Sequence, residues 1–100
     1  MPWLITNKNT TTEGADAARE ALRAAHRAYL TERRDQVILS GPLQSDDGSD
    51  SWGSMFLIQA DSAEQARAFS AQEPFTQAGL YEQVSVTRVL KGLWNPSALG

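Results

Sequence analysis

The chain has 100 residues, a formal net charge of −3 and no cysteine, which excludes disulfides, thiolate catalysis and cysteine-bound metal. Nine basic residues against twelve acidic ones argue against a general binder of nucleic acid or anionic membranes, which would carry a basic stripe. The length predicts a single domain over residues 1–100, with a core at 3–90 and a C-terminal extension at 91–100. A core this small makes association with a partner plausible.

The expected location is the cytoplasm of a bacterium. No apolar run reaches the roughly 20 residues that a membrane-spanning helix needs. The N-terminal stretch MPWLITNKN lacks the basic start and the long apolar segment of a secretory signal. We therefore expect a protein with neither a membrane nor a nucleic acid as its partner.

The first part of the chain predicts a strand, a loop and a helix. Residues 3–5, Trp-Leu-Ile, form a short apolar run typical of a strand, and the polar NKNTTTEG at 7–14 indicates a loop. From residue 15 to 33 the spacing of apolar residues becomes helical, and Arg27 falls away from the apolar side. The side chains expected on the buried side are those of Ala15, Ala18, Leu22, Ala25, His26 and Tyr29.

Two further strands are predicted in the middle of the chain. One covers residues 36–40 and is expected to end at Gly41-Pro42, and the other covers residues 54–60, after a polar loop, QSDDGSDSWG. Both are apolar on both faces, whereas a half-exposed sheet would alternate apolar and polar residues. We therefore expect helices on one face of the sheet and some other cover on the opposite face.

The last third predicts a helix and a strand. Ser62 is expected to cap the helix, with Gln65 completing a capping box. Pro74 should end this helix, because proline disfavours helical geometry in the residue before it, Glu73. Residues 81–90 then alternate, with valines at 84 and 86 on one side, which indicates the final strand.

The order β-α-β-β-α-β, with right-handed crossovers, predicts an α+β fold of the ferredoxin-like type. Such a fold is a four-stranded antiparallel sheet with two helices on one face. No helix remains to cover the second face. The simplest cover is a second copy of the same chain, so we expect a homodimer packed sheet to sheet.

Four blocks in fixed order, RAAHRAYL, ILSGPL, SAEQA and EPFTQAGLYEQVSV, together resemble the YCII-related (YciI-like) proteins. The resemblance runs from about Trp3 to Val89. It implies a dimeric α+β barrel, related in fold to muconolactone isomerase and to small cofactor-free monooxygenases. Some members of the family catalyse dehydrochlorination in the degradation of aromatic compounds, and most have no assigned reaction.

The resemblance also implies a pocket that holds a histidine and an acidic residue. His26 matches the family's histidine, and Arg23 matches an arginine three positions before it. Glu73 stands where the family has an aspartate in front of Pro-Phe or Pro-Tyr. This chain therefore departs from the family pattern by one methylene in the acidic side chain.

His26 is the only histidine, and imidazole can move protons at neutral pH. A carboxylate on its second ring nitrogen would fix the tautomer and raise its basicity. We therefore expect a lyase or isomerase that needs no cofactor and acts on a small cyclic or carboxylated metabolite, with His26 as base and Glu73 as its orienter. Arg23 or Arg19 would hold an anionic group, and Ser40 would donate a hydrogen bond.

Three other interpretations stay open from the sequence. The protein is alternatively a non-catalytic homodimer that binds or senses a small molecule through the same pocket. A second alternative is a haem-binding or oxygen-using relative of the same barrel fold. The third is a purely structural dimer, in which His26 is a core residue with satisfied hydrogen bonds.

Other candidate sites are weaker. One histidine without cysteine argues against structural zinc, so no metal site is expected. Three aspartates, at 46, 47 and 50, lack the spacing and the closing glutamate of an EF-hand, and indicate a solvated loop. Four aromatic residues are candidates for a pocket that takes an aromatic ring, although core or interface positions are commoner for such side chains: Trp3, Trp52, Phe56 and Phe75.

Overall fold

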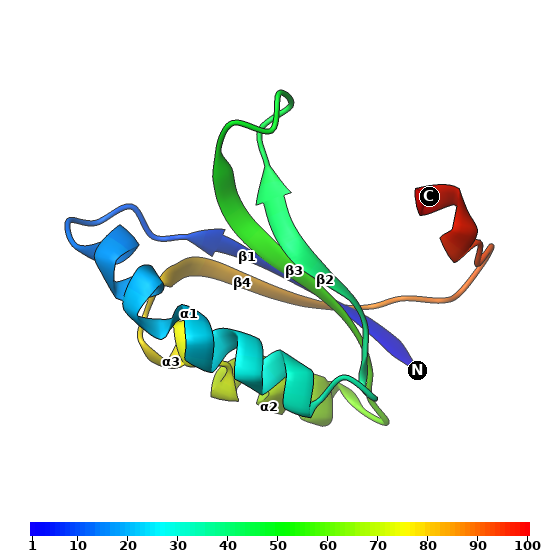
Figure 1. Ribbon diagram of the computed structural model, residues 1–100. Helices are drawn as coiled ribbons and strands as arrows, with labels where there is room; N and C mark the ends of the chain where they lie inside the picture. The colour runs from blue at the N-terminus through cyan, green and yellow to red at the C-terminus, as the bar shows by residue number, and fades with distance from the viewer.

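A computed structural model describes all 100 residues and shows a ferredoxin-like α+β fold (Figure 1). Its four strands form one antiparallel sheet in the order β2-β3-β1-β4. The strands are β1 (Pro2–Asn9), β2 (Val37–Gln44), β3 (Ser51–Gln59) and β4 (Tyr81–Arg88). The helices are α1 (Ala15–Glu32), α2 (Ala63–Gln72), the short α3 (Pro74–Gln77) and a 3-10 turn, η1 (Pro96–Leu99). The predicted element order is confirmed, with α3 and η1 as additions.

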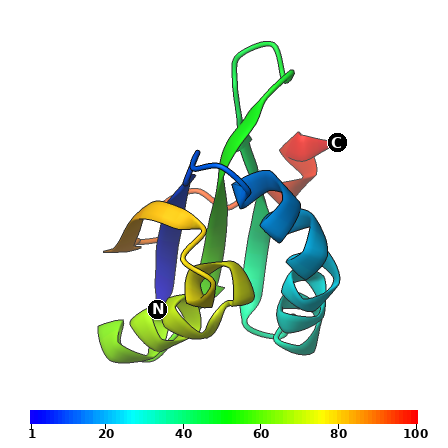
Figure 2. The same ribbon diagram turned by 90° about the vertical axis from the view of Figure 1, so that its left-hand side faces the viewer.

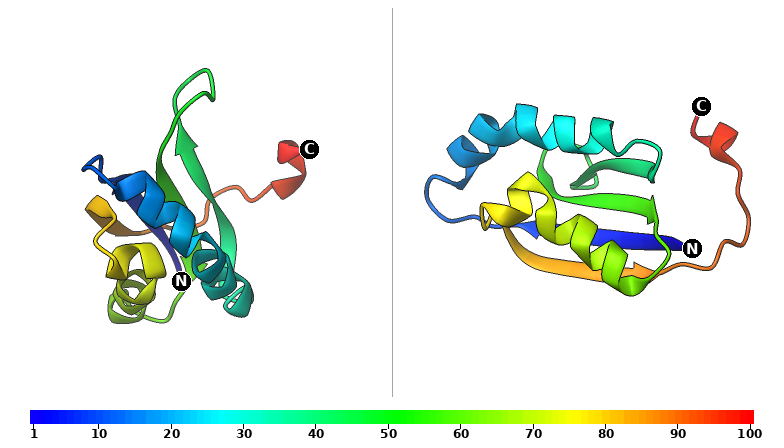
Figure 3. Two further views of the ribbon diagram at one scale, coloured as in Figure 1. Left: turned by 60° about the vertical axis from the view of Figure 1, so that its left-hand side comes forward. Right: turned by 90° about the horizontal axis from the view of Figure 1, so that it is seen from below.

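Both long helices lie on the same face of the sheet, and neither covers the opposite face (Figures 2 and 3). The central strands β1 and β3 supply the core on the helix side, where Ile5 pairs with Phe56 and Trp3 with Ile58. These four side chains are buried and pack with Phe69 of α2. The alternation of buried and exposed residues along β1 follows directly from the two-residue period of a strand.

One buried hydrogen bond joins α1 to α2. The hydroxyl of Tyr29 donates to the carbonyl oxygen of Phe69 at 2.7 Å, and the two rings meet edge to face. Burial raises the pKa of the Tyr29 phenol above its ordinary value. The predicted apolar side of α1 is confirmed in its main members, but Ala25, at the margin of that side, is exposed.

Several boundary predictions in the sheet are wrong. Strand β3 begins at Ser51 rather than at residue 54, and β4 ends at Arg88 rather than at residue 90. Asn7 to Asn9 belong to β1 rather than to a loop, and the buried amide of Asn7 donates to the hydroxyl of Ser54 on β3. Strand β2 does not end at Gly41-Pro42 but continues to Gln44. A proline is tolerated there because β2 is an edge strand, which can lack a donor on its open side.

Helix α2 starts as predicted, and the short helix α3, which was not predicted, follows its end. The hydroxyl of Ser62 accepts from the backbone N–H of Gln65, as an N-cap does. Helix α2 ends at Gln72, since Glu73 is extended before Pro74. The same proline occupies the first turn of α3, a position where its missing N–H costs nothing, so the chain turns once more as a helix.

The uncovered face of the sheet is apolar along its middle. Leu39, Leu57 and Leu4 lie in register across β2, β3 and β1, and Leu39 is 46% exposed. The chain after β4 runs along this side and forms, with Ile38 and Leu57, an open cleft of about 480 Å³. None of the helices is long and apolar enough to cross a membrane.

Gly53 on β3 is a point of close backbone approach. A Cβ atom at this position would lie 2.1 Å from the carbonyl oxygen of Asn7, whereas a Cβ on Gly41 of β2 would meet nothing within 4 Å. We expect Gly53→Ala to destabilise the fold by about 1–3 kcal/mol, because β1 and β3 must separate to admit the methyl group. Chemical denaturation measures this change. Gly41→Ala is the matched control, and equal stabilities of the two variants would contradict the prediction.

Candidate functional site

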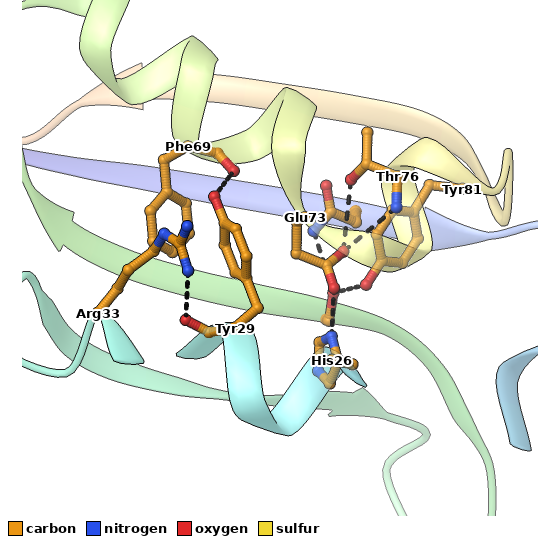
Figure 4. A network of polar contacts seen from close by, with 9 residues as sticks. His26, Tyr29, Arg33, Phe69, Glu73, Thr76 and Tyr81 are labelled. Atoms are coloured by element: carbon orange, nitrogen blue, oxygen red, sulfur yellow. Dashed lines mark hydrogen bonds and ion pairs between the residues drawn. The ribbon is translucent and has the colours of Figure 1, made fainter. Parts of the chain in front are cut away.

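His26 and Glu73 are in direct contact although 47 positions separate them in the sequence. His26 lies in the second half of α1, and Glu73 lies between α2 and α3. The Nδ1 atom of His26 is hydrogen-bonded to Oε1 of Glu73 (Figure 4). The second carboxylate oxygen, Oε2, accepts from the backbone N–H and the hydroxyl of Thr76 at 3.3 and 3.4 Å. Glu73 is therefore both the N-cap of α3 and the partner of the histidine.

The carboxylate of this pair is buried, whereas the imidazole is partly exposed. Glu73 has no exposed surface, whereas the side chain of His26 is 17% exposed. The imidazole stacks on the ring of Phe75, with centroids 4.2 Å apart and planes 7° from parallel. Because Nδ1 is bound to Glu73, Nε2 is the ring nitrogen without a protein partner.

His26 forms part of the wall of a pocket of about 470 Å³ between α1 and the strands β2 and β3. That volume lies within the range of small-molecule sites in proteins. Most of the lining residues are polar or charged. They are Asn9, Asp16, Arg19, Arg23, His26, Arg27, Leu30, Ser40, Gly41, Pro42, Ser51, Gly53, Ser54, Phe56, Phe75 and Tyr81.

Three arginines of α1, spaced by one helical turn each, line the pocket. Arg19 donates to the carbonyl oxygen of Thr10 and pairs with Asp16, and Arg23 pairs with Glu20 at 3.0 Å. The third, Arg27, forms no ion pair. The sequence placed it on the side of the helix away from the core, which is correct, but it reaches the pocket beside His26.

A second polar chain reaches the pocket from the sheet. The amide Nδ2 of Asn7 donates to the hydroxyl of Ser54 at 3.0 Å, and that hydroxyl donates to the phenol oxygen of Tyr81 at 2.9 Å. Burial raises the pKa of Tyr81 far above its ordinary value. The hydrogen bond from Ser54 opposes this, and the charges of Glu73 and Arg19 add smaller raising and lowering effects. The sequence analysis missed these residues. The pairing of Asn7 with Ser54 across two strands could have pointed to them, but the sequence analysis assigned Asn7 to a loop.

The structure brings together all five residues that the sequence singled out, because Arg19, Arg23, His26 and Ser40 line the pocket and Glu73 contacts His26. The aromatic residues divide into two groups. Phe56 and Phe75 line the pocket, whereas Trp3 is buried in the core and donates to the carbonyl oxygen of Ala60. Trp52 is 44% exposed outside it.

Metal-binding side chains are sparse in the site. No group of three histidine, cysteine or acidic residues lies close enough to hold an ion anywhere in the structure. In the loop 45–50 the carboxylate of Asp47 accepts from the hydroxyls of Ser45 and Ser49 and from the backbone of Ser49. The hydrogen bonds from Ser49 lower the pKa of Asp47 to about 2.

Residues 1–90 match the family model of the YCII-related domain. The chain belongs to the YCII-related domain family. Protein YciI of Escherichia coli O6:H1 is 33% identical over 75 residues, which cover 68% of this chain and 76% of the relative. Protein YciI of Shigella flexneri matches equally well. The resemblance of the four sequence blocks is thereby confirmed.

Solved structures share the fold. The 5-chloro-2-hydroxyhydroquinone dehydrochlorinase TftG from Burkholderia phenoliruptrix AC1100, in complex with 2,5-dihydroxybenzoquinone, is 30% identical to this YCII-related chain. The match has a TM-score of 0.79 and covers 92% of this chain and 96% of the other. A NIPSNAP domain protein from Burkholderia xenovorans shares the fold alone, at 15% identity and a TM-score of 0.51 over 96% of this chain and 99% of the other.

The contact with Glu73 makes a prediction about the tautomer of His26. In the neutral ring the proton should reside on Nδ1, because a carboxylate can only accept there, and Nε2 should be unprotonated. The ¹⁵N shifts of the single imidazole, recorded in alkaline solution, measure this directly. Glu73→Ala should abolish the preference and Glu13→Ala, an exposed carboxylate, should leave it unchanged. A wild-type ring protonated on Nε2 would contradict the prediction.

Proposed function

We propose that this protein catalyses proton transfer on a small cyclic, oxygen-bearing metabolite, as a lyase or isomerase, with His26 as the general base. The observation that carries the proposal is the His26–Glu73 pair in the wall of a pocket large enough for such a molecule. Buried histidine–carboxylate contacts of this kind fix the tautomer that leaves one nitrogen free to accept a proton. No step of this chemistry calls for a cofactor.

The chemistry follows from the geometry of the imidazole. Nε2 takes a proton from the substrate, and the electron pair released moves into the ring of the substrate. In an elimination the pair then expels a leaving group, and in an isomerisation His26 returns the proton at another atom. Glu73, fully buried, stabilises the imidazolium formed in the first step without itself meeting the substrate.

The pocket favours an anionic or strongly polar ring. Phe56 and Phe75 offer apolar surface, and Arg27 offers a guanidinium without an ion-pair partner. Arg23, Arg19 and Ser40 are the further groups proposed to hold substrate oxygens. The likeness to TftG, which acts on a chlorinated hydroxyhydroquinone, supports the same substrate class for this chain.

Chloride release from 5-chloro-2-hydroxyhydroquinone tests the proposal. We expect turnover by the wild type and a loss of at least 100-fold in kcat for His26→Gln, because the base is removed. Arg34→Gln, on the exposed turn after α1, is the control and should retain the wild-type rate. Binding of 2,5-dihydroxybenzoquinone should be within about threefold of wild type in His26→Gln if the pocket is intact.

Two outcomes would contradict this function. Turnover by His26→Gln at the wild-type rate would remove histidine from the chemistry. Binding of the quinone by the wild type with no product from any chlorinated or isomerisable hydroxyquinone would instead support a non-catalytic binding or regulatory protein. That alternative uses the same pocket and the same arginines.

We also propose that the protein is a homodimer packed through the uncovered face of its sheet. The leucines at 4, 39 and 57 form a continuous apolar row on this face, with Ile38 beside them. The segment Leu90–Trp94 flanks the same row and adds exposed apolar side chains. A second copy would cover both features at once.

The dimer makes a prediction about Leu39. Leu39→Glu should convert the protein to a monomer, because a carboxylate would be buried against the partner. Val84→Glu is the matched control, since Val84 is also on a strand and 43% exposed but pairs with Asn7 on the helix side of the sheet. Light scattering after size exclusion gives the mass of each variant. A monomeric wild type, or a monomeric Val84→Glu, would contradict the proposal.

A further inference from the structure

The hydrogen-bond chain from Asn7 to Tyr81 has a defined direction. Nδ2 of Asn7 can only donate, so the oxygen of Ser54 accepts from it, and the hydroxyl of Ser54 in turn donates to the phenol oxygen of Tyr81. The carbonyl oxygen Oδ1 of Asn7 is buried without any partner.

This direction determines what the phenol of Tyr81, the last residue in the series of hydrogen bonds, can do with its own proton. The phenol oxygen of Tyr81 already receives a hydrogen bond from Ser54, so its own proton has to be donated elsewhere. The protein supplies no acceptor for it, and Tyr81 lines the pocket that His26 also lines. Burial raises the pKa of the phenol further above its ordinary value, so the hydroxyl keeps its proton at neutral pH.

We propose that Tyr81 donates a hydrogen bond to an oxygen of the substrate, with Ser54 and Asn7 as positioning residues that fix the direction of that donation. The inference rests on the proposed function and deepens it, because it specifies a ring ligand with an anionic oxygen. As Nε2 of His26 takes the proton of the substrate, the released electron pair develops charge on that oxygen. The phenol O–H, already polarised by Ser54, stabilises this charge without giving up its proton.

The test is binding of 2,5-dihydroxybenzoquinone, followed by calorimetry, to the wild type and two tyrosine variants. Tyr81→Phe removes only the hydroxyl and should weaken binding about tenfold or more, as expected for a hydrogen bond to a charged oxygen. Tyr29→Phe is the matched control and should bind within twofold of wild type. Tyr29 is the only other tyrosine, and its hydroxyl donates to Phe69, outside the pocket.

The positioning role has its own readout. Ser54→Ala should lower kcat for chloride release by about tenfold with KM nearly unchanged, because Tyr81 keeps its hydroxyl but loses its polarising donor. Ser54→Thr, which keeps the hydroxyl, should restore the rate. Ser49→Ala, an exposed serine in the loop 45–50, should behave as wild type.

The outcomes separate this inference from the proposed function. Tyr81→Phe that binds the quinone as tightly as the wild type overturns the inference, even if His26→Gln is inactive. A wild type that does not bind the quinone also overturns it, because the stated class of acceptor is then absent. Binding that depends on Tyr81, without any turnover, supports the donor role of Tyr81 and contradicts the catalytic function alone.

Discussion

The structure depends on one buried carboxylate. Glu73 has no exposed surface, so its charge is stabilised only by His26 on α1 and by Thr76 at the start of α3. Removing His26 would leave the buried carboxylate with an unmade hydrogen bond, and a buried polar group left unpaired costs about 1–3 kcal/mol. The middle of α1, the end of α2 and the start of α3 are therefore held in place by the same group that orients the imidazole. The contacts that hold these three helices together therefore also orient the imidazole.

The elements that follow from local chemistry were predictable from the sequence. The cap at Ser62 and the end of α2 before Pro74 depend on neighbouring residues alone. The errors arose where tertiary contacts, rather than neighbouring residues, determine the ends of a strand. Asn7 has the composition of a loop residue, but a partner on the adjacent strand places it in β1. Gly41-Pro42 is a sound signal for a strand end, yet an edge strand tolerates it.

The histidine and the carboxylate of the candidate site were predictable from the sequence, but the strand residues that line the pocket were not. His26 and Glu73 were identified through the resemblance to a family, because a separation of 47 positions gives no sign that two side chains are in contact. The extra methylene of glutamate does not prevent the contact. The role of Ser54 and Tyr81 could not be predicted from the sequence, because their contact depends on the register of three strands. A two-residue pattern predicts faces of a strand, not its alignment with a neighbour.

The three arginines of α1 give the pocket an unusual response to salt. Two of them carry their own acidic partners, so the mouth of the pocket has one uncompensated cation, Arg27, on a molecule whose net charge is −3. An anion therefore meets weak repulsion from the whole protein at long range and attraction from one guanidinium at short range. The Debye length of about 8 Å at physiological ionic strength screens the first effect more than the second. We therefore expect moderate salt to favour the entry of an anion, the reverse of ordinary electrostatic steering.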